Sequence, residues 1–199
     1  MKNIILDRKN TTSFDPNFKV PREDLEEILY LAGKAPSSWN LQHWKFFVFE
    51  SKSSKEQLLP IAYYQKQIID SSAVVAVLAD TEANLNFDDV YNPLVEKGYI
   101  NDLIKTKIKS QVERAHETSY DSLEQALINA PLAAITLVYA AESKGYNTGI
   151  IGGFDKERFK DTFDVPKNLI PIMLIPIGKR IAEPHYSERF PLDRTTFWL

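Results

Sequence analysis

The residues best suited to bind a ligand lie together at positions 35–44, Ala-Pro-Ser-Ser-Trp-Asn-Leu-Gln-His-Trp. Hydroxyl and amide side chains can hydrogen-bond the polar edge of a flat heteroaromatic molecule, while indoles contact its face. Pro36 cannot continue a helix and Gly33 weakens the turn before it, so a loop is expected here. The stretch therefore predicts a loop that binds a flat heteroaromatic ligand.

Two other stretches carry groups that would suit such a ligand. Arg8, Lys9 and Asn10 form a compact set of donors for a phosphate, although such a trio is also typical of a solvated basic turn. Gly152 and Gly153 would let backbone N–H groups approach a ligand, or would simply form a turn. The residues alone leave both alternatives open.

Other kinds of chemistry find little support in the sequence. Ser37 and Ser38 lie near His43, but the Gly-x-Ser-x-Gly elbow of a serine nucleophile is absent. The remaining histidines, His116 and His185, are isolated and lack the spacing of metal ligands. Neither a dinucleotide-binding nor a P-loop glycine motif occurs. The chain has no cysteine, so redox chemistry would require a bound cofactor.

Composition indicates one ordinary globular domain. The chain has 199 residues, of which 44% are hydrophobic and 26% charged. A formal net charge of -3 gives no general attraction to nucleic acid or to an anionic membrane. No apolar run approaches the ~20 residues of a membrane span, and the first apolar run ends at Asp7, too early for a signal peptide. The expected location is the cytoplasm.

Helices and strands are expected to position these groups. Helical spacing and capping residues predict three main helices, 21–34, 54–67 and 122–144, and a short one ending at Phe163. Aromatic and β-branched runs predict three strands, 44–49, 73–79 and 172–178. Pro60 should break its helix, Pro131 should kink its helix or start a new one, and Pro176 should mark the end or edge of its strand.

Two segments are harder to assign. Residues 81–120 are rich in charge and predict a variable helical insertion, either a lid or an arm that reaches a neighbouring subunit. Within it, 104–109 is expected to be a solvated helix face. The tail, 186–199, carries Phe190, Leu192, Phe197 and Trp198 and should dock against something. Together the elements predict one α+β domain spanning 1–199.

Five motifs, in order, resemble those of the nitroreductase family of FMN-dependent NAD(P)H oxidoreductases, especially its short bacterial members. They are the basic start at 8–12, the loop at 36–42, Gln67, the segment 151–154 and the C-terminal segment 189–193. The resemblance covers nearly the whole chain apart from 81–120.

The resemblance implies an FMN site built from these segments. Arg8 and Arg189 would anchor the phosphate, and Asn40 and Gln42 would bind flavin and ribityl groups. The backbone of Gly152 or Gly153 would lie near flavin N5. The implied cofactor-binding residues are Arg8, Lys9, Asn10, Thr12, Pro36, Ser37, Ser38, Trp39, Asn40, Gln42, Gln67, Ile151, Gly152, Gly153 and Arg189. FMN would carry the chemistry, with no catalytic side chain and no metal.

The chain departs from the family pattern at four positions. Thr12 replaces a third basic residue, Lys9 replaces an arginine, and Ser187 stands where some members have a basic residue. Fewer fixed charges would weaken phosphate binding. His43 replaces the proline before the loop's second tryptophan, where it would narrow or polarise the pocket.

The family fold implied is an α+β homodimer with a central mixed, mainly antiparallel sheet flanked by helices and with FMN at the subunit interface. NAD(P)H would deliver hydride to the flavin and leave, and an electron-poor acceptor such as a nitroaromatic or a quinone would then take the electrons, by a ping-pong mechanism. Two alternatives remain: a non-enzymatic FMN-binding or storage protein, and a flavin-free structural dimer.

Overall fold

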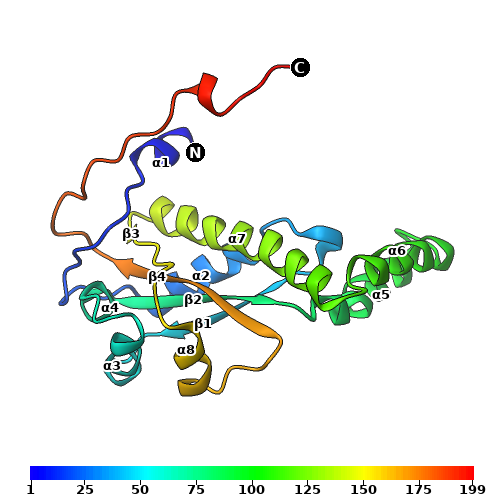
Figure 1. Ribbon diagram of the computed structural model, residues 1–199, viewed down its shortest axis with the longest axis horizontal. Coiled ribbons are helices and arrows are strands. Elements are labelled where there is room, and N and C mark those ends of the chain that lie inside the picture. The colour runs from blue at the N-terminus through cyan, green and yellow to red at the C-terminus, as the bar shows by residue number, and fades with distance from the viewer.

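The computed structural model describes residues 1–199 and has the predicted α+β architecture. One four-stranded sheet has the order β1-β2-β4-β3, and each neighbouring pair is antiparallel. Its strands are β1 (Trp44–Phe49), β2 (Ala73–Asp80), β3 (Asn147–Thr148) and β4 (Leu169–Gly178). Helices cover both faces of this sheet (Figure 1).

Two sets of helices make the two outer layers. The layer on one face contains α2 (Arg22–Ala32) and the long α7 (Ser119–Ser143), which pack on β1, β2 and β4. The layer on the other face contains α3 (Lys52–Ile61), α4 (Gln67–Asp70) and α8 (Lys156–Thr162). Because both faces are covered, all of β2 is buried, with Val75 and Val77 in one core and Val74 and Ala76 in the other.

The break predicted near Pro60 is confirmed, whereas Pro131 disturbs its helix less than the sequence suggests. Pro60 lies in the last turn of α3, so the helix ends just after it, at Ile61. Pro131 lies inside α7, which continues through it; the carbonyl that loses its partner belongs to Leu127, on a half-exposed face where water can bind it. α7 then ends before Gly145, whose φ is +82°.

The strand that contains Pro176 ends close to it, as predicted, because β4 ends at Gly178; β4 is nevertheless an inner strand, between β2 and β3. The carbonyl of Pro176 accepts a hydrogen bond from Gly149 N–H at 3.0 Å, on the side of the short β3. The N–H that proline lacks would face the same side, so the ladder with β2 loses nothing.

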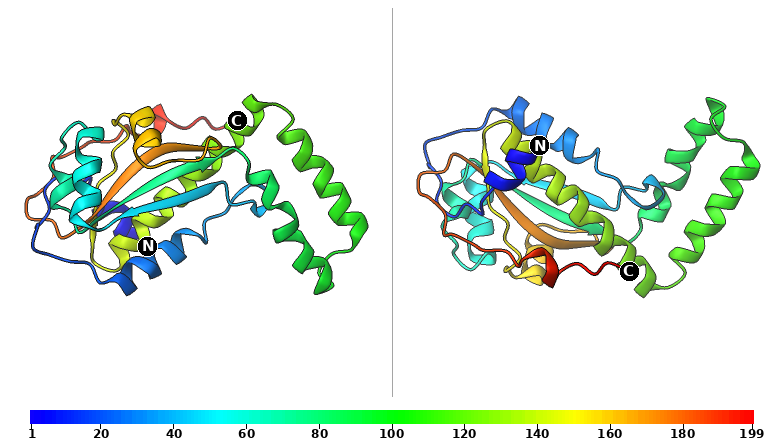
Figure 2. Two further views of the ribbon diagram at one scale, coloured as in Figure 1. Left: turned by 90° about the horizontal axis from the view of Figure 1, so that it is seen from below. Right: turned by 90° about the horizontal axis from the view of Figure 1, so that it is seen from above.

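Residues 81–120 form a helical hairpin that projects from one end of the sheet (Figure 2). The 3-10 turn η2 (Ala83–Asn86) leads into α5 (Phe87–Glu96), and α6 (Asp102–Ala115) runs back. A small core of its own holds the hairpin together, made of Leu41, Ala83, Phe87, Tyr91 and Val112. Leu41 belongs to the predicted ligand-binding loop, so this loop and the hairpin share one core.

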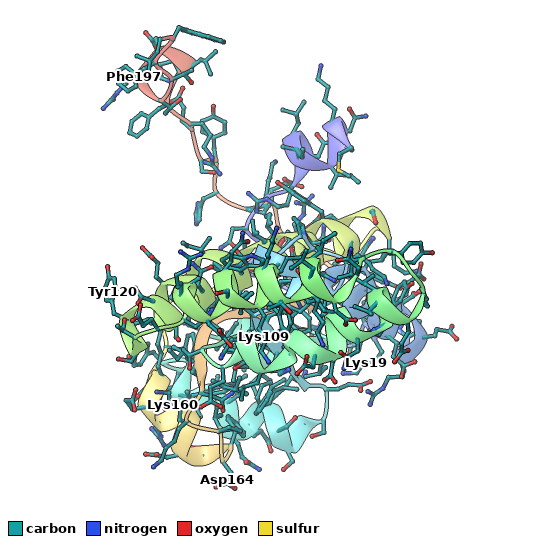
Figure 3. All side chains as sticks on the ribbon, turned by 90° about the vertical axis from the view of Figure 1, so that its right-hand side faces the viewer. Lys19, Lys109, Tyr120, Lys160, Asp164 and Phe197 are labelled. Carbon is teal, nitrogen blue, oxygen red and sulfur yellow. The ribbon has the colours of Figure 1, made fainter.

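Both termini extend away from the body (Figure 3). The helix α1 (Lys2–Asp7) buries none of its residues, and the tail containing η3 (Leu192–Arg194) is exposed. Phe197 and Trp198 are 83% and 87% exposed, so the tail does not dock within its own chain. α7 is long and apolar enough to cross a membrane, but half of its apolar window is buried, as in the core helix of a globular domain.

Candidate functional site

The N-terminal motif lies beside the segment that follows β3. Asn10 Oδ1 accepts a hydrogen bond from Ile150 N–H at 2.6 Å. Lys9 Nζ lies 3.1 Å from a carboxylate oxygen of Glu183, which comes shortly before the tail. Arg8 forms no ion pair and is only half-buried. The structure therefore brings the predicted phosphate donors next to the glycine segment and leaves the guanidinium of Arg8 available to an anion.

Close backbone packing fixes this arrangement. Thr11 N–H donates to the carbonyl of Thr148 at 2.9 Å, and Thr11 is 1% exposed. A Cβ on Gly149 would stand 2.6 Å from the carbonyl oxygen of Thr11. The chain can approach β3 this closely because residue 149 has no side chain. Thr12, the next predicted site residue, directly follows the buried Thr11 and is exposed.

A partly buried carboxylate supports the same region. Glu142 Oε1, near the end of α7, accepts hydrogen bonds from Thr148 N–H at 3.0 Å and Thr148 Oγ1 at 2.8 Å. Burial raises the pKa of Glu142, although the bonds from Thr148 and the positive charge of Arg8 oppose that rise. Glu142 thus ties the end of α7 to the strand on which the N-terminal motif rests.

The glycine segment forms an open backbone edge. Ile151 exchanges two hydrogen bonds of 2.9 Å with Leu174 of β4, which anchors the start of the segment. Gly152 and Gly153 follow and are exposed, and a Cβ at either position would meet no atom within 4 Å. The peptide groups of the two glycines therefore face space that a flat ligand can enter without meeting a side chain.

Two glutamines border this edge. Gln65 Nε2 donates to the carbonyl of Gly153 at 3.0 Å, and Gln67 Nε2 donates to Gln65 Oε1 at 3.1 Å. Gln67 is 7% exposed, and its Oε1 is buried without a partner. An unpaired buried acceptor costs roughly 1–3 kcal/mol, so a partner for Gln67 Oε1 would stabilise this region.

The predicted loop at 36–42 adopts a strained conformation. Trp39, Asn40 and Gln42 have φ angles of 50°, 57° and 56°, in the left-handed region. Each such residue costs on the order of 1–3 kcal/mol, and strain of this kind concentrates at functional sites. Ser37 Oγ stabilises the turn by accepting a hydrogen bond from Gln42 N–H at 3.0 Å. Pro36 and Asn40 are exposed, so the amide of Asn40 is open to a ligand.

Asn129 is a site residue that the sequence analysis missed. It is 1% exposed on α7, where its Oδ1 accepts from Ser38 N–H at 2.7 Å and its Nδ2 donates to Ser38 Oγ at 3.2 Å. One amide thus binds the backbone and the side chain of a predicted ligand-binding serine. A buried asparagine among the alanines of α7 was the available signal, because a buried amide needs partners.

His43 lies in a different place from the one expected. Its side chain is fully buried below the loop, so it neither narrows nor polarises a pocket at the loop surface. Its ring stacks on that of His116, with the ring centroids 5.6 Å apart and the planes 9° apart.

The predicted site residues form two groups along α7, one near the middle of the helix and one near its C-terminal end. The loop is anchored at Asn129, whereas the N-terminal motif and the glycine edge are anchored near Glu142. The helical rise over the intervening residues is about 20 Å. Arg189 joins neither group, because its hydrogen bonds go to Ser187 and Glu188 within the tail. A single chain therefore does not assemble the whole predicted site.

The fold and these groups define a class of protein: an α+β domain whose basic N-terminal segment and open glycine edge suit a flat, phosphorylated ligand. Comparison with known sequences gives the family. The sequence model described as "Nitroreductase family" matches residues 5–179. The chain belongs to the nitroreductase family, and it is an oxidoreductase.

Individual relatives are similar over their full length. "Putative NAD(P)H nitroreductase YodC" of Bacillus subtilis is 47% identical over 196 residues, which are 98% of this chain and 97% of that protein. The "CLA biosynthesis enone reductase" of Lactiplantibacillus plantarum is 28% identical and covers 100% of this chain and 94% of that protein. A "putative nitroreductase in complex with FMN" from Exiguobacterium sibiricum superposes with a TM-score of 0.91 at 31% identity, covering 99% and 96%.

Proposed function

We propose that the protein is an FMN-dependent oxidoreductase that takes hydride from NAD(P)H and reduces an electron-poor acceptor by a ping-pong mechanism. The observation that carries this proposal is the open edge of Gly152 and Gly153 beside the vacant acceptor of Gln67. That combination suits the polar edge of a flavin ring. FMN, when bound, supplies the redox chemistry by accepting hydride and passing the electrons on.

The residues present fit this cofactor. Arg8, free of any ion pair, and Arg189 offer planar guanidinium groups to the phosphate. Lys9 adds a point charge, although Glu183 now neutralises it. The two glycines bring backbone donors to the ring without steric interference. Gln67 Oε1, which lacks a partner in this chain, would accept a hydrogen bond from a donor on the ring edge.

The complete site requires a second copy of the chain, and we propose a homodimer with FMN at the interface. The loop that carries Ser37, Ser38 and Asn40 lies about 20 Å along α7 from the glycine edge of its own chain. In a twofold dimer the loop of one protomer can face the glycine edge of the other. The exposed apolar tail, with Phe197 and Trp198, supplies the surface that such an assembly buries.

The acceptor is proposed only as a chemical class. Among its relatives are proteins named as nitroreductases and one named as an enone reductase. Nitroaromatics, quinones and enones share an electron-poor conjugated system that accepts hydride or electrons. The chain's own task is to hold the flavin and leave one face open, so no side chain is assigned as a general acid or base.

Replacing both guanidinium groups tests the phosphate assignment. The double variant Arg8→Gln/Arg189→Gln removes two charge-assisted contacts, each worth about 1.5–3 kcal/mol, and should weaken FMN binding by at least roughly a hundredfold. The matched control is Arg158→Gln, an exposed arginine on α8. FMN affinity is measured by quenching of flavin fluorescence. Equal affinity in the double variant and the control would refute the assignment.

A further inference from the structure

The loop at 36–42 is joined to the α5–α6 hairpin through a stacked pair of imidazoles, of which His43 is buried and His116 partly buried. His43 directly follows the loop and is 0% exposed, and its ring stacks on that of His116, the residue that ends α6. The ring of Trp39, inside the loop, lies 6.5 Å from His116 in a tilted arrangement. The hydroxyl of Tyr91, on α5, donates a hydrogen bond to the carbonyl oxygen of Trp39 at 3.1 Å. The stack therefore connects the loop, β1 and the hairpin at one point.

The polar atoms of this pair are poorly satisfied. His116 Nδ1 lies 2.9 Å from the carbonyl of Val112, which assigns its proton to Nδ1 and leaves Nε2 buried without a partner. Both ring nitrogens of His43 are buried without a partner. Parallel rings direct their lone pairs in parallel planes, so the pair is unsuited to sharing a metal ion. Because a charged ring would bury an N–H donor without an acceptor, this arrangement is favourable only when both rings are neutral.

The surrounding charges do not stabilise a cation at His43. His116 faces it from the turn between α6 and α7, and Asp80 faces it from the end of β2. Asp80 is engaged by Lys45 of β1 at 3.7 Å and by Asn168 at 2.8 Å. Burial, followed by the charge of His116, lowers the pKa of His43 to about 4, and Asp80 only partly offsets this.

We propose that His43 and His116 form a proton-sensitive latch that holds the loop against the α5–α6 hairpin and opens when His43 is protonated. A protonated His43 has two N–H donors and no acceptor inside the stack, so it must reach water, which separates the hairpin from the loop. His43 stands where the motif of the family usually has proline. Its effect on flavin binding rests on the proposed function.

Proton linkage sets the size of the effect. A histidine that ionises near 6.5 when open and near 4 when closed favours opening as the pH falls between those values. The equilibrium constant for opening should rise roughly 25-fold between pH 7.5 and pH 5. It should be nearly constant above pH 7.5, where His43 is neutral in both states.

Amide hydrogen exchange on the full chain measures the opening. Protection factors across α5 and α6, corrected for the intrinsic effect of pH on exchange, should fall roughly 25-fold between pH 7.5 and pH 5, while those of β2 stay constant. His43→Phe keeps an aromatic ring in the stack but cannot be protonated, so it should abolish this pH dependence. His185→Gln, in the exposed tail, is the matched control and should retain it.

Two results would overturn the proposal: hairpin protection in the wild type that does not change with pH, or pH dependence that persists in His43→Phe. If His43→Phe fails to fold, an NMR titration of the three wild-type histidines decides. A midpoint for His43 near 4 supports the latch, and one at or above 6.5 refutes it. Neither readout involves flavin. A failure of the latch is therefore distinguishable from a failure of the proposed FMN site, which the Arg8/Arg189 variant tests separately.

Discussion

Replacing Gly149 by alanine should displace the N-terminal motif. The new Cβ would lie 2.6 Å from the carbonyl oxygen of Thr11, a separation that folded proteins do not tolerate. That oxygen belongs to the backbone, and the bond from Thr11 N–H to Thr148 holds the segment in place, so no side-chain rotation relieves the clash. Overpacking of this kind costs about 1–3 kcal/mol.

The measurement is the change in unfolding temperature, followed by circular dichroism. For a chain of this size, that cost corresponds to a decrease of roughly 2–12 °C in Tm. The matched control is Gly152→Ala, whose Cβ would meet no atom within 4 Å and whose φ lies outside the left-handed region. Its Tm should stay the same or rise slightly, because alanine restricts the unfolded chain.

The comparison also tests the function of the segment. Because Gly149 fixes the approach of residues 8–12 to β3, Gly149→Ala should also purify with less FMN than the wild type. If Gly149→Ala unfolds at the same temperature as Gly152→Ala, the close approach does not hold the motif in place and the reasoning fails.

Three further changes have expected outcomes. Asn129→Ala leaves the loop without its anchor, a loss of about 1–3 kcal/mol, and should raise the Kd for FMN roughly 5- to 150-fold, measured by fluorescence titration. Burial raises the pKa of Glu142, so the folded state binds the proton more tightly and the ionised group destabilises it at neutral pH. Glu142→Gln should therefore raise Tm at pH 7, by an amount that shrinks as the pH falls into the ordinary glutamate range. The double change Phe197→Ser/Trp198→Ser should shift the protein from dimer to monomer in sedimentation velocity experiments.

Each of these has a matched control. Thr136→Ala removes a hydrogen bond that stays within α7, and its Kd should equal that of the wild type; an equal Kd for Asn129→Ala would contradict the anchoring role. Glu157→Gln changes an exposed glutamate, and a Tm that responds as in Glu142→Gln would disprove the effect of burial. Leu85→Ser removes an exposed apolar side chain outside the tail; if it dissociates the dimer equally, the tail is not the interface.

Local patterns predicted most of the sheet and its helices. The predicted strand 44–49 matches β1 at both ends. The predicted strand 73–79 ends one residue before β2 does; its continuous apolar run was readable because both faces of β2 are buried. The sequence did not decide whether the strand that contains Pro176 is an edge strand, because that depends on the short β3, which pairs on the side of the missing N–H. That information is not local, so a single stretch of sequence does not contain it.

The sequence predicts the residues of the candidate site but not their arrangement in space. The N-terminal motif does lie beside the segment 151–154, because Ile150 N–H, directly before that segment, donates a hydrogen bond to Asn10. Asn129 and the buried position of His43 depend on contacts across the fold, from α7 and from the end of α6. In the proposed homodimer a second chain would cover the exposed tail, and no intrachain pattern can reveal such a contact.

The most direct test of the account is an absorbance spectrum of the purified protein, repeated without oxygen after NADH or NADPH is added. The account predicts a flavin band that bleaches with one of these donors and returns when a quinone or nitroaromatic is supplied. A flavin band that persists with both donors would contradict enzymatic turnover and favour an FMN-storage protein. No flavin band, even after FMN is supplied, would contradict the assignment of Arg8, Gly152, Gly153 and Arg189 to a cofactor site.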